Sequence, residues 1–141
     1  MGKMDGGLRL LFRQRILGVD WVSIESGITG AGIPDLNFCY KAIEGWIECK
    51  QTPGHTVTLD RMQVGWIARR VRNGGRVWIA VRQKAPAGPR RVARDVLWII
   101  PGHGAALAKE HGLHANIDGM EDYHGGPSKW PWQAIASKLI S

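Results

Sequence analysis

The chain has 141 residues, 44% of them hydrophobic and 22% charged, as in an ordinary folded domain and unlike a disordered or fibrous chain. Nineteen Lys and Arg against twelve Asp and Glu give a formal net charge of +7. This excess favours a polyanionic partner, most commonly nucleic acid, although charge alone leaves open a basic protein that binds no DNA. No apolar run approaches the roughly 20 residues that span a bilayer.

The N-terminal MGKMDGG lacks the hydrophobic segment of a signal peptide. Two cysteines, Cys39 and Cys49, are too few for a disulfide scaffold. We therefore expect a cytoplasmic protein with reduced thiols that uses no membrane. Its length predicts a single domain over 1–141.

The first half of the chain predicts one helix and three strands. Residues 8–17 have apolar side chains at helical spacing, and Gly18 follows as a stop. Residues 19–25 and 35–40 alternate as strands do, with a Gly- and Pro-rich loop between them. After a short turn, the stretch GWIECKQ forms the second arm of a predicted hairpin.

The second half predicts a helix from Thr58, the expected N-cap, to the Asn-Gly-Gly stop at residues 73–75. Its predicted apolar stripe is Leu59, Met62, Trp66 and Ile67. Residues 76–82 are apolar on both faces, as in a central strand covered on both sides, and 95–100 form a further strand. Helices are expected over about 104–111 and 130–140.

These elements predict an α/β fold: a mixed central sheet flanked by helices, with an αβββαβ core over about 8–100. An additional strand belongs to that core region, and residues 101–141 are expected to form a C-terminal helical extension.

Three charged residues are expected to meet at one point of this fold. Because side chains alternate along a strand, Glu48 and Lys50 leave the same face. Asp35 starts the other arm of the hairpin. Two close carboxylates repel unless a cation lies between them, and hard oxygen ligands suit Mg²⁺ or Mn²⁺. Lys50 could then orient or help deprotonate a metal-bound water, the nucleophile of metal-assisted phosphodiester hydrolysis. By spacing alone, a surface ion pair is an equal alternative.

The order Ile-Pro-Asp, Ile-Glu-Cys-Lys and Leu-Asp-Arg-Met-Gln over roughly residues 8–82 resembles the PD-(D/E)xK nuclease superfamily, and within it the VRR-NUC and Holliday-junction-resolvase-like branch. The resemblance implies a restriction-endonuclease-like sheet, metal ligands at Asp35 and Glu48, and a catalytic lysine at Lys50. It also implies a further ligand in the main-chain carbonyl of Cys49.

Two more residues acquire candidate roles from this resemblance. Gln63 matches a glutamine typical of the branch; by its position it points towards the sheet and either braces the active site or satisfies a buried backbone group. The first helix offers no acid where many members of the superfamily have one, so Glu25 is the substitute, as a metal ligand or simply an exposed acid. Short phage-encoded nucleases often have a similar Glu-Ser-Gly before the PD motif.

The resulting hypothesis is a Mg²⁺-dependent, phage-encoded endodeoxyribonuclease that acts on branched or junction DNA as a homodimer, with the terminal helices as candidate interface. Phosphate contacts are expected from six arginines: Arg69, Arg70, Arg72, Arg90, Arg91 and Arg94. The alternative is a non-catalytic nucleic-acid-binding module that keeps the nuclease fold. A structural phage protein fits the charge but leaves the ordered motifs unexplained.

Overall fold

A six-stranded mixed sheet forms the centre of the computed structural model, which describes residues 4–24 and 32–141. The strands lie side by side in chain order: β1 (Asp20–Ser23), β2 (Leu36–Tyr40), β3 (Ile43–Thr52), β4 (Val77–Ala85), β5 (Arg94–Pro101) and β6 (Glu121–Tyr123). β3 and β4 run parallel, and every other neighbouring pair is antiparallel. The predicted α/β class with a mixed sheet is confirmed.

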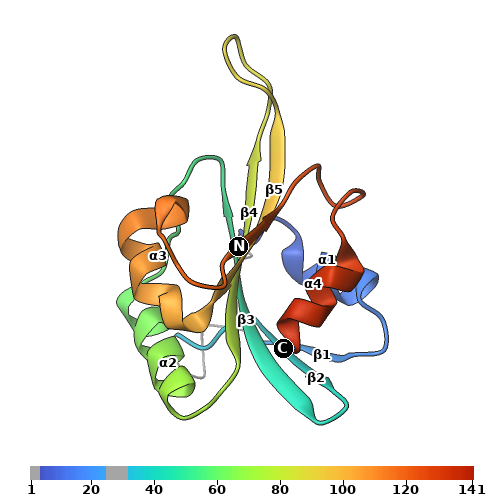
Figure 1. Ribbon diagram of the computed structural model, residues 1–141, viewed down its shortest axis with the longest axis vertical. Coiled ribbons are helices and arrows are strands. Elements are labelled where there is room, and N and C mark those ends of the chain that lie inside the picture. Colours follow the sequence, from blue (N-terminus) through green and yellow to red (C-terminus); the bar gives the residue numbers. More distant parts are fainter. Residues whose placement is uncertain (1–3, 25–31) are drawn as a thin grey trace.

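Helices cover both faces of this sheet (Figure 1). On one face lie α2 (Arg61–Arg72) and α3 (Ala105–His111), and on the other lie α1 (Leu8–Arg15) and α4 (Trp132–Leu139). Single 3₁₀ turns, η1 (Gly102–Gly104) and η2 (Gly112–His114), flank α3. α2 connects β3 to β4, because parallel neighbours need a crossover connection.

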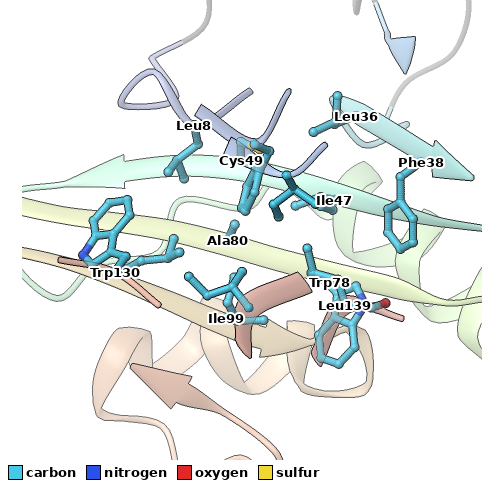
Figure 2. Packing of buried hydrophobic residues seen from close by; sticks show 14 residues of the cluster. Leu8, Leu36, Phe38, Ile47, Cys49, Trp78, Ala80, Ile99, Trp130 and Leu139 are labelled. Atoms are coloured by element: carbon cyan, nitrogen blue, oxygen red, sulfur yellow. The ribbon is translucent and has the colours of Figure 1, made fainter. Parts of the chain in front are cut away.

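The first hydrophobic core lies between the sheet and the helices α1 and α4. It includes Leu8 and Phe12 of α1, Ile47 and Cys49 of β3, and Leu139 of α4. Figure 2 shows Ile47, Cys49 and Ala80 projecting into this core from adjacent strands. The alternation predicted for β3 is therefore confirmed, and Glu48 leaves the opposite face.

The second core lies under α2 and α3. Ile67 of α2 packs there with Val77, Ile79 and Val81 of β4 and with Ala105 of α3. β4 places Trp78 and Ala80 in the first core, so it is buried on both faces, as its apolar sequence predicts.

The start of α2 differs from the prediction. Its N-cap is Asp60 and not Thr58, because Asp60 and Gln63 form a capping box: each side chain bonds the other residue's backbone N–H. Starting the helix at Arg61 turns Gln63 and Ile67, one turn apart, to the sheet. Met62, predicted to be in the apolar stripe, is instead 58% exposed.

The C-terminal part adds more than helices. β6 pairs with β5 through Leu97↔Tyr123 and two further positions, and Ile135 and Leu139 of α4 are buried in the first core. β6 escapes sequence analysis because three mostly polar residues carry no alternating pattern. Within the described ranges, no helix has the length and apolar character needed to cross a membrane.

Candidate active site

The β2–β3 hairpin determines which residues face each other. Its two-residue turn, Lys41 and Ala42, has positive φ at both positions, 46° and 70°, as the favoured two-residue hairpin turns require. This turn aligns Tyr40 with Ile43, and the ladder ends at Leu36↔Ile47. One residue further along both strands are Asp35 and Glu48. The two acids predicted to meet are therefore neighbours in register, 1% and 0% exposed.

The Asp35 side chain bonds the backbone of β3 just beyond the point where β2 stops pairing with it. Its Oδ2 accepts a 2.9 Å hydrogen bond from the backbone N–H of Cys49, replacing the strand partner that β3 loses after Ile47. Because the N–H and C=O of a strand residue point to the same edge, the Cys49 carbonyl is directed to the edge occupied by Asp35. The Cys49 carbonyl, expected from the sequence to be a further metal ligand, therefore points towards Asp35.

Glu48, Lys50 and Gln63 form a hydrogen-bonded triangle on the α2 side of the sheet. The Gln63 amide donates from Nε2 to Glu48 Oε2 at 3.0 Å. The Lys50 ammonium lies 3.3 Å from the same Glu48 oxygen and donates to Gln63 Oε1 at 3.3 Å. Lys50 has a side chain only 13% exposed. The ion pair thus joins a buried acid to a partly buried lysine, unlike an ion pair exposed on the surface of a strand.

Gln63 has a second set of contacts, at the start of α2. Its Oε1 accepts from the Asp60 backbone N–H at 3.0 Å, and its own N–H donates to Asp60 Oδ1 at 2.8 Å. Because two donors converge on Oε1, the amide orientation is determined by its partners. One Gln63 side chain therefore contacts the acid and the lysine and also satisfies a backbone group at the start of α2.

The donor set fits a hard divalent cation. Two buried carboxylates, Asp35 and Glu48, are neighbours in register beside the backbone of Cys49. Carboxylate and carbonyl oxygens are the ligands that Mg²⁺ and Mn²⁺ prefer. Among residues 4–24 and 32–141, no three His, Cys, Asp or Glu side chains gather closely enough to hold a metal by themselves. Glu25 lies outside the described residues.

Asp5 and Arg9 are neighbours of the site that the sequence analysis missed. Asp5 is buried, and its carboxylate accepts from the Gly7 N–H at 2.9 Å and from Arg9 Nε at 2.8 Å. The bond to Asp5 and the nearby charge of Asp35 raise the pKa of Arg9. The signal that could have found this pair is the acid–arginine spacing of four at the start of a helix.

The buried thiol of Cys49 is affected by the nearby carboxylates. Burial raises the pKa of Cys49 well above its ordinary value, and the carboxylates of Asp35, Asp5 and Glu48 raise it further. Cys49 is thus a neutral packing residue whose backbone, and not whose sulfur, faces the candidate site.

The predicted DNA-contacting arginines form two separate groups. Arg69, Arg70 and Arg72 belong to the last turn of α2, and Arg70 stacks on Trp66 with 4.5 Å from its Cζ to the ring centre. Arg90, Arg91 and Arg94 belong to the β4–β5 hairpin, which stands at the opposite end of the molecule (Figure 1). The acid–lysine site lies between the two groups along β3, because Gln63 is at the start of α2 and β4 pairs past Lys50 to Thr52.

Comparison with solved structures shows a similarity of the fold. The chain resembles the solved structure of Hjc, a Holliday junction resolvase from the archaeal hyperthermophile Archaeoglobus fulgidus, with 17% identity and a TM-score of 0.47 over 71% of this chain and 75% of that chain. No protein-family model matches the chain, and no curated protein matches it by sequence.

Proposed function

We propose that the chain is a metal-dependent endonuclease of the PD-(D/E)xK type that hydrolyses phosphodiester bonds in DNA. The observation that supports this is the convergence of Asp35, Glu48 and Lys50 at one edge of β3, with Gln63 joining the acid to the lysine. Ionisable groups gathered in the interior of a protein are typical of active sites.

In this proposal Asp35, Glu48 and the Cys49 carbonyl hold Mg²⁺ or Mn²⁺. When bound, the ion supplies Lewis-acid stabilisation of the negative charge that develops on the attacked phosphate. Lys50 lies beside Glu48 and orients the attacking water by a charge-assisted hydrogen bond. Gln63 is a positioning residue, because it contacts Glu48 and Lys50 and is itself held by the cap of α2.

The proposed substrate is DNA, with branched or junction DNA favoured. The net charge of +7 and the two arginine groups on either side of the site support a path for phosphates across it. Membership of the VRR-NUC and resolvase-like branch, a phage origin and action as a homodimer belong to the same proposal. The dimer is tested by the mass of the protein in solution, measured by sedimentation.

The test combines cleavage with binding. The protein is incubated with linear, flapped and four-way junction DNA in Mg²⁺, Mn²⁺ or EDTA, beside the variants Asp35→Asn, Glu48→Gln and Lys50→Ala. We expect metal-dependent cutting by the wild type, loss of at least about 10²-fold in each variant, and unchanged DNA affinity in EDTA. Cutting by Lys50→Ala at the wild-type rate would show that another site or another enzyme is responsible.

A non-catalytic DNA-binding module is the second candidate. The observation that favours it is that the Lys50 ammonium is already bonded to Glu48 and Gln63, as a purely structural lysine would be. Binding on every substrate without metal-dependent cutting on any of them would select this candidate.

A further inference from the structure

The β4–β5 hairpin extends beyond the rest of the sheet. β3 makes its last pair with β4 at Thr52↔Gln83, whereas β4 and β5 continue to Ala85↔Arg94. The tip, residues 86–93, projects away from the helices on both faces (Figure 1). We call residues 84–94 the arm. A two-stranded ribbon without covering helices is free to contact something outside the domain.

The arm carries charge of a single sign. Between positions 84 and 94 the sequence contains four cations, Lys84, Arg90, Arg91 and Arg94, and no acid. The next residue, Asp95, does not neutralise them, because Arg82 holds it through two bonds of 2.9 and 2.7 Å. The side chains of residues 84, 90 and 91 are exposed. A concentration of cations on a projecting ribbon is unfavourable for folding and is matched by a polyanion.

The tip is held in one shape. Gly88 and Arg91 exchange two backbone hydrogen bonds of 2.9 and 3.1 Å, and Arg91 Nε donates to the Pro86 carbonyl at 3.1 Å. Pro86 and Pro89 restrict the backbone further. At the base, Arg94 donates to the Pro53 carbonyl at 2.7 Å. Such a preorganised element loses little conformational entropy when it binds.

The arm is connected to the candidate site by the sheet. Lys50 is level with Val81 on β4, and Gly88 follows seven residues later, which at 3.3 Å per residue is about 23 Å. At about 3.4 Å per base pair this corresponds to about seven base pairs. A surface hollow of about 640 Å³ at the base of the arm is lined by Gln51, Lys84 and Arg94 among others.

We infer that the arm grips the flank of a DNA duplex about seven base pairs from the phosphate at the Asp35–Glu48–Lys50 site. This rests on the proposed function, which supplies the position of that phosphate. The major groove admits a two-stranded ribbon, with Arg90 and Arg91 on the phosphates at its edges. The enzyme thus requires duplex, not only a branch, on one side of its site.

The test measures binding in EDTA, so that its result does not depend on cutting. Four-way junctions and linear duplexes are compared in which one duplex flank is shortened stepwise from about 14 to about 4 base pairs, bracketing the distance worked from the strand rise. We expect the affinity of the wild type to fall about tenfold once the flank is shorter than about seven base pairs, and the double variant Arg90→Ala/Arg91→Ala to bind all lengths with the weaker affinity. The salt slope of that variant should be shallower by about two.

The matched control is Arg13→Ala/Arg15→Ala on α1, which removes the same charge from an exposed position away from the arm. It should keep the dependence on flank length. Because Arg91 also braces the tip, two further variants separate the shape of the tip from its charge. Arg90→Ala removes one charge and leaves the Arg91 bond in place. Arg90→Lys/Arg91→Lys keeps both charges, so it should retain the salt slope.

Equal losses in the arm variant and the control, or a wild type indifferent to flank length, would overturn the inference. So would an arm variant whose sedimentation shows a changed oligomeric state with DNA affinity preserved, because the arm would then be a protein contact. A wild type that binds as expected yet never cuts refutes the proposed endonuclease but leaves the arm as a duplex-binding element.

Discussion

The substitution Gln63→Glu places a carboxylate against Glu48 and so tests the geometry of the candidate site directly. The new side chain has the same shape and keeps two acceptor bonds, from Lys50 Nζ and from the Asp60 N–H. It loses the one bond that the Gln63 side chain donates, because the amide nitrogen that lies 3.0 Å from Glu48 Oε2 is replaced by a carboxylate oxygen. A donor–acceptor pair is converted into two acceptors inside a site where Glu48 is 0% and Gln63 is 7% exposed.

The size of the effect follows from two contributions. A hydrogen bond to a charged group contributes about 1.5–3 kcal/mol, and two like charges about 4 Å apart repel by about 4 kcal/mol at an effective dielectric constant near 20. Protonating one carboxyl relieves the repulsion but costs about 3–4 kcal/mol at pH 7 and only about 1 kcal/mol at pH 5. With Lys50 offsetting part of this, we expect a loss of about 3–5 kcal/mol in the free energy of unfolding at pH 7 and about 2 kcal/mol less at pH 5.

The sign of the pH dependence is the discriminating result. The folded variant takes up a proton that its unfolded chain does not bind near pH 7, so its stability relative to wild type falls as pH rises. Urea unfolding followed by tryptophan fluorescence in EDTA at pH 5, 6 and 7 measures this. Gln63→Leu is the control: it removes the same bonds without adding an ionisable group, so its loss should depend less steeply on pH than the loss in Gln63→Glu. If both variants showed the same pH dependence, Gln63 would not lie against Glu48.

Two further predictions concern the strand that carries the site. A β-carbon at Gly45 would clash with the ring of Phe38, so Gly45→Ala should lower the free energy of unfolding by about 1–3 kcal/mol. Gly54→Ala, with open space around it, should leave thermal melting nearly unchanged. Equal melting of both variants would contradict this packing. Burial holds the pKa of Cys49 well above its usual range, so a thiol reagent at pH 8 should modify it only after unfolding in urea; fast modification of two thiols in the native protein would be inconsistent with the core in Figure 2.

Much of the fold could be predicted from local pattern. The alternation of Ile47 and Cys49 with Glu48 and Lys50, the hairpin and the doubly buried strand β4 all appear in the structure. These predictions succeed because side chains alternate along a strand and because a strand covered on both sides has to be apolar throughout. The start of α2 could not be assigned from the pattern, since Thr58 and Asp60 are both good caps and only the reciprocal bond with Gln63 selects between them.

The candidate site was predictable as residue types but not as contacts. That Asp35 bonds the Cys49 backbone, and that Gln63 contacts both Glu48 and Lys50, depends on where β2 stops pairing and where α2 begins. The two groups of arginines look alike in the sequence, yet they lie at opposite ends of the molecule. The spacing of Asp5 and Arg9 indicates that they contact each other, but they become neighbours of Asp35 only through the packing of α1.

By itself the sequence determined the alternating strands, the apolar faces and the basic charge, because these depend on the period of each element and on composition. The tertiary structure decided that Asp35 lies next to Glu48 in register, that Gln63 joins Glu48 to Lys50, and that a basic arm stands apart from the body. Those outcomes depend on register, on helix ends and on chain direction, which bring together residues that are distant in the sequence.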